Sequence, residues 1–563
     1  MKRAAALGLL LALTIPARAA TETAPTFNRD VAPILFANCA ECHHAGGVAP
    51  FSLMSYSEVK KRAKLIARVT GKRYMPPWMP EPGHGDFVGE RRLTDDQIKT
   101  LVRWSETGLR EGAAADLPPL PKPPGDWQLG PPELIVTMPA PFDLPADGPD
   151  VYRNFVLPSV VPADSYVRAL ELRPGATGAI HHAFLFVDES GDGRRLEKLE
   201  AGPGFPGMVA GRGARNPGGF VSWQPGRRPS EVPKGMSWQL RKNADLILQM
   251  HLRPTGKPEK VQPSLGLYFT DQRPSRPNLI LLLRSVAIDI PAGDRDYAIE
   301  AAYRLPVDVQ LIGLLPHMHY LGKEAHGWAE LPDGTKRELI SIKRWDFDWQ
   351  SDFRYREPVR LPKGTTLQMR YTFDNSAQNV RNPHQPPQRV QYGLQSSDEM
   401  GELWFWIETQ TPAELDALNR DYINNWGLAD TVAQSEALLR RDPKDAFTRT
   451  ELGASLAGLG KTNEALPHLR QAVTDNPNIQ RAHFVLGTLL LGQRRYTEAS
   501  RALISAAELA PNDAAAQTNL GLALLAQGKI ATGREHLEKA LALDPANKVA
   551  RDALDRANAP QPK

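Results

Sequence analysis

Five histidines and one methionine in the middle of the chain have side chains that bind transition metals. Two of them, His317 and His319, are two residues apart in an apolar run that predicts a β-strand. Alternate residues of a strand share one face, so both imidazoles can reach a single ion. The other candidates lie in or beside similar segments: His181, His182, His251 and Met400. The pattern predicts two metal sites on a β-rich scaffold.

The ligand types favour copper over zinc. Three imidazoles suit an ion that cycles between Cu(II) and Cu(I), while a thioether favours Cu(I), the state that binds dioxygen. Zinc is the competing metal for the histidines, but zinc sites rarely recruit methionine. His181 and His182 are adjacent and would face opposite sides of a regular strand. We therefore predict an irregular backbone, at a strand end or a bulge, where both bind one ion.

The order of these residues resembles the ligand pattern of the copper type II, ascorbate-dependent monooxygenases, the family of peptidylglycine alpha-hydroxylating and dopamine beta-monooxygenases. The likeness spans residues 151–412 and implies two all-β, jelly-roll-like sandwiches, at 151–275 and 276–412. It also implies an electron-transferring copper and an oxygen-binding, catalytic copper, held respectively by His181, His182 and His251 and by His317, His319 and Met400. The animal enzymes of this family carry disulfides, whereas residues 151–412 contain no cysteine.

The two cysteines of the chain occur together, in the segment Cys39-Ala-Glu-Cys42-His43. This spacing is typical of covalent haem c attachment, with His43 as an iron ligand. A disulfide or redox pair is the alternative. The sixth iron ligand is expected from a proline-flanked loop, with Met75 as the first candidate and Met79 as the second. Residues 24–113 resemble a small, all-α cytochrome c-like domain, closed by a helix that Thr94 caps and Gly108 ends.

A proline-dense stretch and a helical repeat complete the chain. Residues 114–150 predict a semi-rigid linker. In the region 427–563, prolines recur every 34 residues at Pro443, Pro477, Pro511 and Pro545, and Leu-Gly pairs keep the same period. This period is that of the tetratricopeptide repeat, in which pairs of helices stack. Such an array offers a surface for a protein or peptide, although a stabilising or dimerising role is the alternative.

Composition and the chain start indicate an exported protein. Residues 1–19 combine Lys2-Arg3, an apolar run and a small-residue cleavage site, as in a secretory signal. We therefore expect a periplasmic or secreted protein, with an uncleaved anchor as the alternative and no membrane span in the mature chain. A net charge of +4 without basic blocks argues against a nucleic-acid partner.

Together these features predict a copper-dependent monooxygenase that hydroxylates a C–H bond of an organic or peptide substrate with dioxygen. Its expected cofactors are two copper ions and one covalent haem c, which an external donor would reduce. The alternative is a non-catalytic haem and copper protein that transfers electrons or binds copper, with a repeat domain for partner docking.

Overall fold

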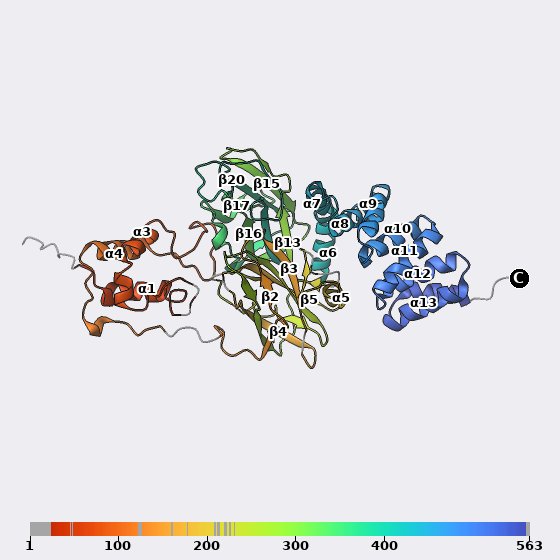
Figure 1. Cartoon of the computed structure of the whole chain (residues 1–563), viewed down its shortest axis with the longest axis horizontal. Coiled ribbons are helices and arrows are strands. Elements are labelled where there is room, and N and C mark those ends of the chain that lie inside the picture. The colour runs from red at the N-terminus through yellow and green to blue at the C-terminus, as the bar shows by residue number, and fades with distance from the viewer. Residues whose placement is uncertain are drawn as a thin grey trace, which may run out of the picture. The chain divides into compact units, whose positions relative to one another are not determined.

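The computed structural model describes residues 24–558 except for 46, 48, 122–126, 159–160, 177, 208–209, 211–213, 219–221, 225–226 and 230. The predicted signal at 1–19 therefore lies outside the described residues. The chain is multidomain, with a small helical part, a central all-β part of antiparallel sheets and a carboxy-terminal helical array (Figure 1). It divides into two compact units, 1–78 with 91–124, and 79–90 with 125–563.

The first unit is a small group of helices around one apolar cluster. Its elements are η1 (Phe27–Val31), α1 (Ala32–Asn38), α2 (Tyr56–Lys60), α3 (Ala63–Gly71), α4 (Asp95–Glu106) and η2 (Ala114–Asp116). Thr94 and Gln97 form a capping box at the start of α4, and Gly108 follows its end with φ of +89°. Leu101 and Trp104 of α4 are buried in the cluster. The predicted closing helix is thus confirmed, with the expected cap and apolar face.

The second unit contains a first pair of antiparallel sheets, in the orders β1-β12-β4-β9 and β6-β3-β10-β5-β7, with β8 beside β5. Their strands and the intervening helix are β1 (Leu134–Thr137), β3 (Val151–Leu157), β4 (Ser165–Arg173), β5 (Ile180–Asp188), α5 (Asp192–Glu197), β6 (Phe205–Pro206), β7 (Ala214–Arg215), β8 (Ser222–Trp223), β9 (Trp238–Leu240), β10 (Asp245–Leu252) and β12 (Ser264–Thr270). A small ladder joins β2 (Phe142–Leu144) to β11 (Glu259–Val261).

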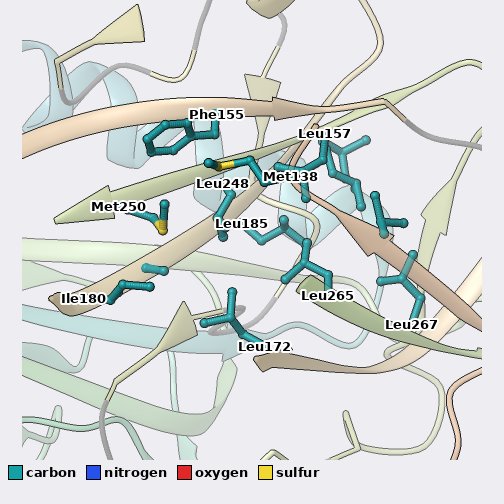
Figure 2. Packing of buried hydrophobic residues seen from close by; sticks show 14 of the residues in the cluster. Met138, Phe155, Leu157, Leu172, Ile180, Leu185, Leu248, Met250, Leu265 and Leu267 are labelled. Atoms are coloured by element: carbon teal, nitrogen blue, oxygen red, sulfur yellow. The ribbon is translucent and has the colours of Figure 1, made fainter. Parts of the chain in front are cut away.

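One apolar core holds this first sheet pair together (Figure 2). Leu185 of β5 and Leu248 of β10 come from one sheet, while Leu172 of β4 and Leu265 of β12 come from the other. All four are at most 6% exposed. Burial of large aliphatic side chains on both sheets explains how this region folds without a disulfide, since each fully buried side chain contributes about 1.5–3 kcal/mol.

A second pair of antiparallel sheets follows, in the orders β13-β22-β16-β19 and β15-β20-β17-β18. Its strands are β13 (Asn278–Arg284), β15 (Tyr297–Arg304), β16 (Val309–Met318), β17 (Gly322–Glu330), β18 (Lys336–Ile342), β19 (Phe353–Leu361), β20 (Thr366–Phe373) and β22 (Gly401–Glu408), with the short ladder β14 (Asp289–Ile290) to β21 (Val390–Gln391) and the turn η3 (Phe347–Trp349). β16 lies between β19 and β22; its pairing with β19 ends at Leu314, whereas its pairing with β22 continues to Met318.

The carboxy-terminal helices include the expected repeat array of the region 427–563, which begins with the helix that starts at Leu428. They are α6 (Pro412–Tyr422), η4 (Ile423–Gly427), α7 (Leu428–Arg441), α8 (Ala446–Gly458), α9 (Thr462–Asp475), α10 (Gln480–Gly492), α11 (Tyr496–Leu509), α12 (Ala514–Ala526), α13 (Ile530–Leu543) and α14 (Lys548–Asn558). The recurring glycines lie where paired helices approach most closely. A Cβ at Gly453, Gly487 or Gly521 would overlap a leucine of the next helix. Close packing therefore explains the period of the sequence.

In two segments the structure differs from the domain boundaries predicted from the sequence. Strands β1 and β2 fall inside the predicted linker 114–150, where flanking prolines obscure such short strands. Residues 79–90, assigned from sequence to the domain 24–113, group with the second unit. Their backbone pairs with β19, for example where the Val88 N–H donates to the Arg354 carbonyl at 2.8 Å. Within the described part of the chain, no helix has the length and apolarity needed to cross a bilayer.

Candidate metal centre

A bulge brings His181 and His182 together with His251. His251 on β10 lies opposite His182 on β5, but the next residue of β10, Leu252, pairs with Ile180. His181 is therefore the extra residue of a bulge, which allows two adjacent side chains to serve one site. The predicted irregular backbone is confirmed. Ligand atoms of the three rings lie within 4.8 Å of one another, and all three residues are buried. This triad could hold a metal ion.

Hydrogen bonds set the proton positions in the triad. Nε2 of His251 lies 2.9 Å from Oδ2 of Asp150, so we assign the ring proton to Nε2. The lone pair of His251 Nδ1 then faces Nε2 of His182 at 3.2 Å. Two nitrogen ligands about 2.0 Å from a tetrahedral ion are roughly this far apart. Nδ1 of His181 and Nδ1 of His182 are buried without a hydrogen-bond partner. For His181 the unpaired Nδ1 is a nitrogen that a metal ion could bind, whereas His182 already faces the triad with Nε2.

The triad is also held in the neutral form that metals require. Burial lowers the pKa of His181 and His182 well below the ordinary range, and the neighbouring His251 lowers both further. Burial lowers the pKa of His251 as well, although the carboxylate of Asp150 opposes that shift. Neutral imidazoles have a free lone pair, so no proton must be displaced before an ion binds.

His317 and His319 form a second pair at the end of β16. Their ring centroids are 5.2 Å apart. Nδ1 of His317 lies 2.6 Å from Oε1 of Gln350, and Nδ1 of His319 lies 3.2 Å from the carbonyl oxygen of Asp398. An oxygen acceptor at each Nδ1 assigns the proton there and leaves Nε2 of both rings as a free ligand. Burial lowers the pKa of His319 well below the ordinary range.

The buried carboxyl group of Glu399 joins Met400 to this pair. Its Oε1 accepts the backbone N–H of His319 at 2.5 Å and that of Met400 at 2.9 Å, and its Oε2 accepts the N–H of Leu321. In the ladder between β16 and β22, Met318 pairs with Gly401, which follows Met400. The backbones of His319 and Met400 therefore meet at one carboxylate oxygen. Burial raises the pKa of Glu399 to about 8, against the effect of these hydrogen bonds.

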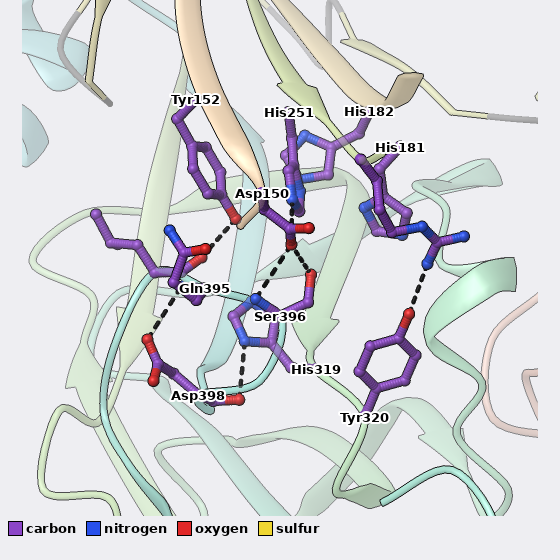
Figure 3. A network of polar contacts seen from close by, with 12 residues as sticks. Asp150, Tyr152, His181, His182, His251, His319, Tyr320, Gln395, Ser396 and Asp398 are labelled. Atoms are coloured by element: carbon purple, nitrogen blue, oxygen red, sulfur yellow. Dashed lines mark hydrogen bonds and ion pairs between the residues drawn. The ribbon is translucent and has the colours of Figure 1, made fainter. Parts of the chain in front are cut away.

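The two histidine groups are neighbours in space. The ring centroids of His182 and His317 are 6.1 Å apart, and His181 stacks on Phe347 at 4.1 Å. Asp150, which binds His251, also accepts hydrogen bonds from the backbone and the hydroxyl of Ser396 (Figure 3). The first and the second sheet pair thus share one polar network around the candidate ligands.

The structure adds orienting residues that the sequence did not reveal. Asp150, Gln350 and Glu399 carry no motif of their own, because their roles depend on tertiary contacts between distant segments. Two further histidines lie outside the predicted ligand set. Nε2 of His326 lies 2.5 Å from Oε2 of Glu338. The backbone N–H of His384 donates to Oδ1 of Asn382 in a turn.

The cysteine motif follows directly on α1. The N–H of His43 donates to the Cys39 carbonyl at 2.9 Å, which continues a helical turn through the motif. Neither Cys39 nor Cys42 forms a disulfide, and burial raises the pKa of Cys39 to about 12. Nδ1 of His43 lies 3.0 Å from the Phe51 carbonyl, so its Nε2 is the free ring nitrogen. Met75 falls within the first unit, whereas Met79 groups with the second.

Comparisons with known proteins bear on the helical array. The sequence pattern of the tetratricopeptide repeat family matches residues 450–499 and 484–548. The carboxy-terminal array is therefore a tetratricopeptide repeat domain, a kind of module that binds peptides and proteins. None of the curated proteins that were compared matches the chain.

Solved structures of repeat proteins resemble a part of the chain. MamA from Desulfovibrio magneticus RS-1 is 24% identical over 25% of this chain and 81% of its own, with a TM-score of 0.23. YrrB, described as a tetratricopeptide protein with an unusual peptide-binding site, is 25% identical over 26% of this chain and 75% of its own, with a TM-score of 0.22. The first repeat domain of Spaghetti (RPAP3), bound to an HSP90 peptide, is 20% identical over 20% of this chain and 89% of its own, with a TM-score of 0.19.

Proposed function

We propose that this protein is an exported, copper-dependent monooxygenase that hydroxylates a C–H bond of an organic or peptide substrate with dioxygen. The observation that carries the proposal is the convergence of five histidines from two sheet pairs, with the two groups only 6.1 Å apart between the His182 and His317 rings. Two sets of ligands this close could hold two ions that take part in one reaction.

The donor sets fit copper. The triad offers imidazoles alone, while the second site would offer two imidazoles and, with the Met400 backbone held beside that of His319, the thioether of Met400, which favours Cu(I). Copper would supply electron transfer at the triad and dioxygen activation at the second site. The residues around them have their own tasks: Asp150 and the Asp398 carbonyl orient rings, and burial of His251 and His319 to 1% exposure excludes water.

Two further elements belong to the same proposal. Each sheet pair would be one jelly-roll-like sandwich, as the resemblance at 151–412 implies. The first unit would be a cytochrome c-like domain with haem bound to Cys39 and Cys42 and ligated by His43. Two cysteines without a disulfide and the available Nε2 of His43 fit that cofactor, and Met75, in the same unit, is favoured over Met79 as the sixth ligand. The haem would supply electrons from an external donor.

A non-catalytic electron carrier is the second candidate. It is favoured by the burial of His181, His182, His251 and His319, each at most 8% exposed, because a hydroxylase must also admit a substrate. In that case the repeat domain, which in other proteins binds peptides, would dock a redox partner.

Metal analysis and a labelled-oxygen experiment test the proposal. The purified protein should contain two copper ions and one haem c per chain. The reduced protein should then transfer one atom of ¹⁸O₂ into a product, found by untargeted mass spectrometry of candidate substrates. A Met400→Leu variant should keep the haem but lose labelled product. Two coppers without any label in product would favour the carrier, and a protein that binds neither metal would exclude both functions.

A further inference from the structure

The loop of residues 392–400, here called the ligand loop, carries two groups of the second candidate site. Met400 is at its end, and the carbonyl oxygen of Asp398 accepts a hydrogen bond from the Nδ1–H of His319 at 3.2 Å. Hydrogen bonds inside the loop fix its shape: the N–H of Gln395 donates to Oδ2 of Asp398 at 3.0 Å, and the N–H of Asp398 donates to the Gln395 carbonyl at 2.8 Å. Whatever holds Asp398 therefore also sets the orientation of His319.

The last residue of α7, Arg441, contacts both sides of this loop. Its guanidinium forms an ion pair with Oδ1 of Asp398 at 2.6 Å and donates to the Tyr392 carbonyl at 3.3 Å. The Asp398 side chain is only 11% exposed, while that of Arg441 is 43% exposed. A planar guanidinium with several donors can bridge two acceptors in a fixed geometry. Arg441 thus joins the start of the ligand loop to the residue that orients His319.

A glycine in the loop supports the same contact independently. A Cβ at Gly393 would overlap the guanidinium of Arg441 and the carboxylate of Asp398. The φ angle of Gly393 is not among the positive ones, so its backbone does not demand glycine. The small residue at this position therefore makes room for the ion pair.

The helix that carries Arg441 is fixed on both sides. Arg284 of β13, buried beside it, pairs with Asp430 at 2.6 Å, and Gln434 donates to the hydroxyl of Tyr392 at 2.8 Å. On the other side, Leu439 belongs to the apolar core of the repeat array. α7 therefore packs against both the second sheet pair and the array. A movement of the array relative to the sheets would move α7 and, with it, Arg441.

We propose that Arg441 is a positioning residue for the second metal site, so that the first helix of the array forms a part of this site. This proposal rests on one assumption that it shares with the function proposed above, namely that His317, His319 and Met400 are copper ligands. Arg441 holds Asp398, Asp398 orients His319, and the fixed loop presents Met400. A partner that bound the array and moved α7 would then change the second site most, and would affect the triad to a smaller degree through Ser396, which donates to Asp150.

The experiment has a metal-free arm and a copper arm. In the first, hydrogen exchange of the full-length apoprotein is compared between the parent, Arg441→Ala and Arg440→Ala, whose side chain is exposed on the same turn. We expect faster exchange in residues 392–400 with Arg441→Ala alone. In the second, competition with a Cu(I) chelator should show an affinity about tenfold weaker at the Met400 site, with a smaller change at the triad, which the loop contacts through Ser396 and Asp150. Arg441→Lys should give a smaller loss, because it keeps charge but not the planar fork.

The outcomes separate this proposal from the proposed function. If the parent protein binds no Cu(I) at the second site, the monooxygenase proposal fails, while the exchange data still decide whether Arg441 holds the loop. Exchange in 392–400 that is the same in Arg441→Ala and Arg440→Ala overturns the positioning role. Equal weakening at both copper sites also overturns it, since that result indicates general destabilisation. Should Arg441→Ala fail to fold, Arg441→Lys carries both comparisons.

Discussion

Asp150 and His251 are joined by a hydrogen bond of 2.9 Å between Oδ2 and Nε2, just where the chain enters β3. Burial alone would raise the pKa of Asp150, but its hydrogen bonds to His251 and Ser396 lower that pKa to about 2. The carboxylate therefore stays ionised at neutral pH. It fixes the proton of His251 on Nε2 and turns Nδ1 toward the other two histidines.

Replacing Asp150 should weaken metal binding at the triad. Asp150→Asn keeps the shape of the side chain but removes the charge that selects the tautomer of His251. Loss of such a partner typically costs 10-fold to 100-fold in metal affinity, that is about 1.4–2.7 kcal/mol. Competition titration with Cu(II) would measure the change. Asp147→Asn, at an exposed position three residues earlier, is the matched control and should bind as the parent does. Equal affinities in the two variants would show that Asp150 does not orient the ligand.

Two glycines of one helix test whether close packing between helices stabilises the repeat array. In α10, a Cβ at Gly487 would overlap the side chain of Leu503, whereas a Cβ at Gly492 would meet nothing within 4 Å. We expect Gly487→Ala to lower the free energy of unfolding of the array by about 1–3 kcal/mol, the usual cost of overpacking. Gly492→Ala should be neutral or slightly stabilising, since alanine has the higher helix propensity. Chemical denaturation followed by circular dichroism distinguishes them, and a neutral Gly487→Ala would contradict the packing explanation.

The sequence predicted helices and strands well where a repeat or a capping pattern is clear in the local sequence. The 34-residue recurrence of Gly453, Gly487 and Gly521 corresponds to helix pairs in close contact, and Thr94 caps α4 as its spacing from Gln97 indicates. The adjacent His181 and His182 implied a bulge, because a regular strand cannot direct both to one side. The register shift on β5 meets that requirement.

Other features depend on contacts that no local pattern encodes. The carboxyl group of Glu399 accepts N–H groups from His319 and Leu321, which are about 80 residues away along the chain. The strand Leu134–Thr137 is only four residues long and lies among prolines, so its pairing with β12 decides its conformation. The contact between Arg441 and Asp398 links a helix to a loop of another domain, and no local pattern shows that these two residues meet.

A pH-dependent contribution to stability is expected from Glu338 on β18. Burial raises the pKa of Glu338, but hydrogen bonds from His326 and Lys336 outweigh this effect and lower the pKa to about 2. A folded-state pKa below the unfolded value of about 4.3 means that the ionised group stabilises the fold above that pH and ceases to do so as the pH falls toward 2. Because the side chain is 31% exposed, the contribution should not exceed about 1 kcal/mol.

Glu338→Gln should therefore be less stable than the parent near pH 6, and the difference should close between pH 5 and pH 2. Glu357→Gln, at an exposed position of β19, serves as the control and should show no such convergence. Urea denaturation at several pH values measures both differences. A gap between Glu338→Gln and the parent that stays constant down to pH 2 would mean that the ion pair contributes no pH-dependent stability.

Variants of the cysteine motif should distinguish the covalent bonds of haem to the cysteines from the bond between His43 and the haem iron. In a host that attaches haem c, Cys42→Ser should leave at most one thioether bond, so haem should be partly lost on denaturing gels. His43→Ala should keep the covalent bonds but remove the ring nitrogen that is left free by the hydrogen bond to Phe51. Its reduced spectrum should then change to that of an iron lacking the histidine ligand.

The control for this prediction is His44→Ala, because Nδ1 of His44 forms a local hydrogen bond with the carbonyl of the adjacent Ala45. A parent protein without a pyridine haemochrome spectrum, or a His43→Ala spectrum identical to that of His44→Ala, would refute haem ligation by this motif and favour a dithiol role for Cys39 and Cys42.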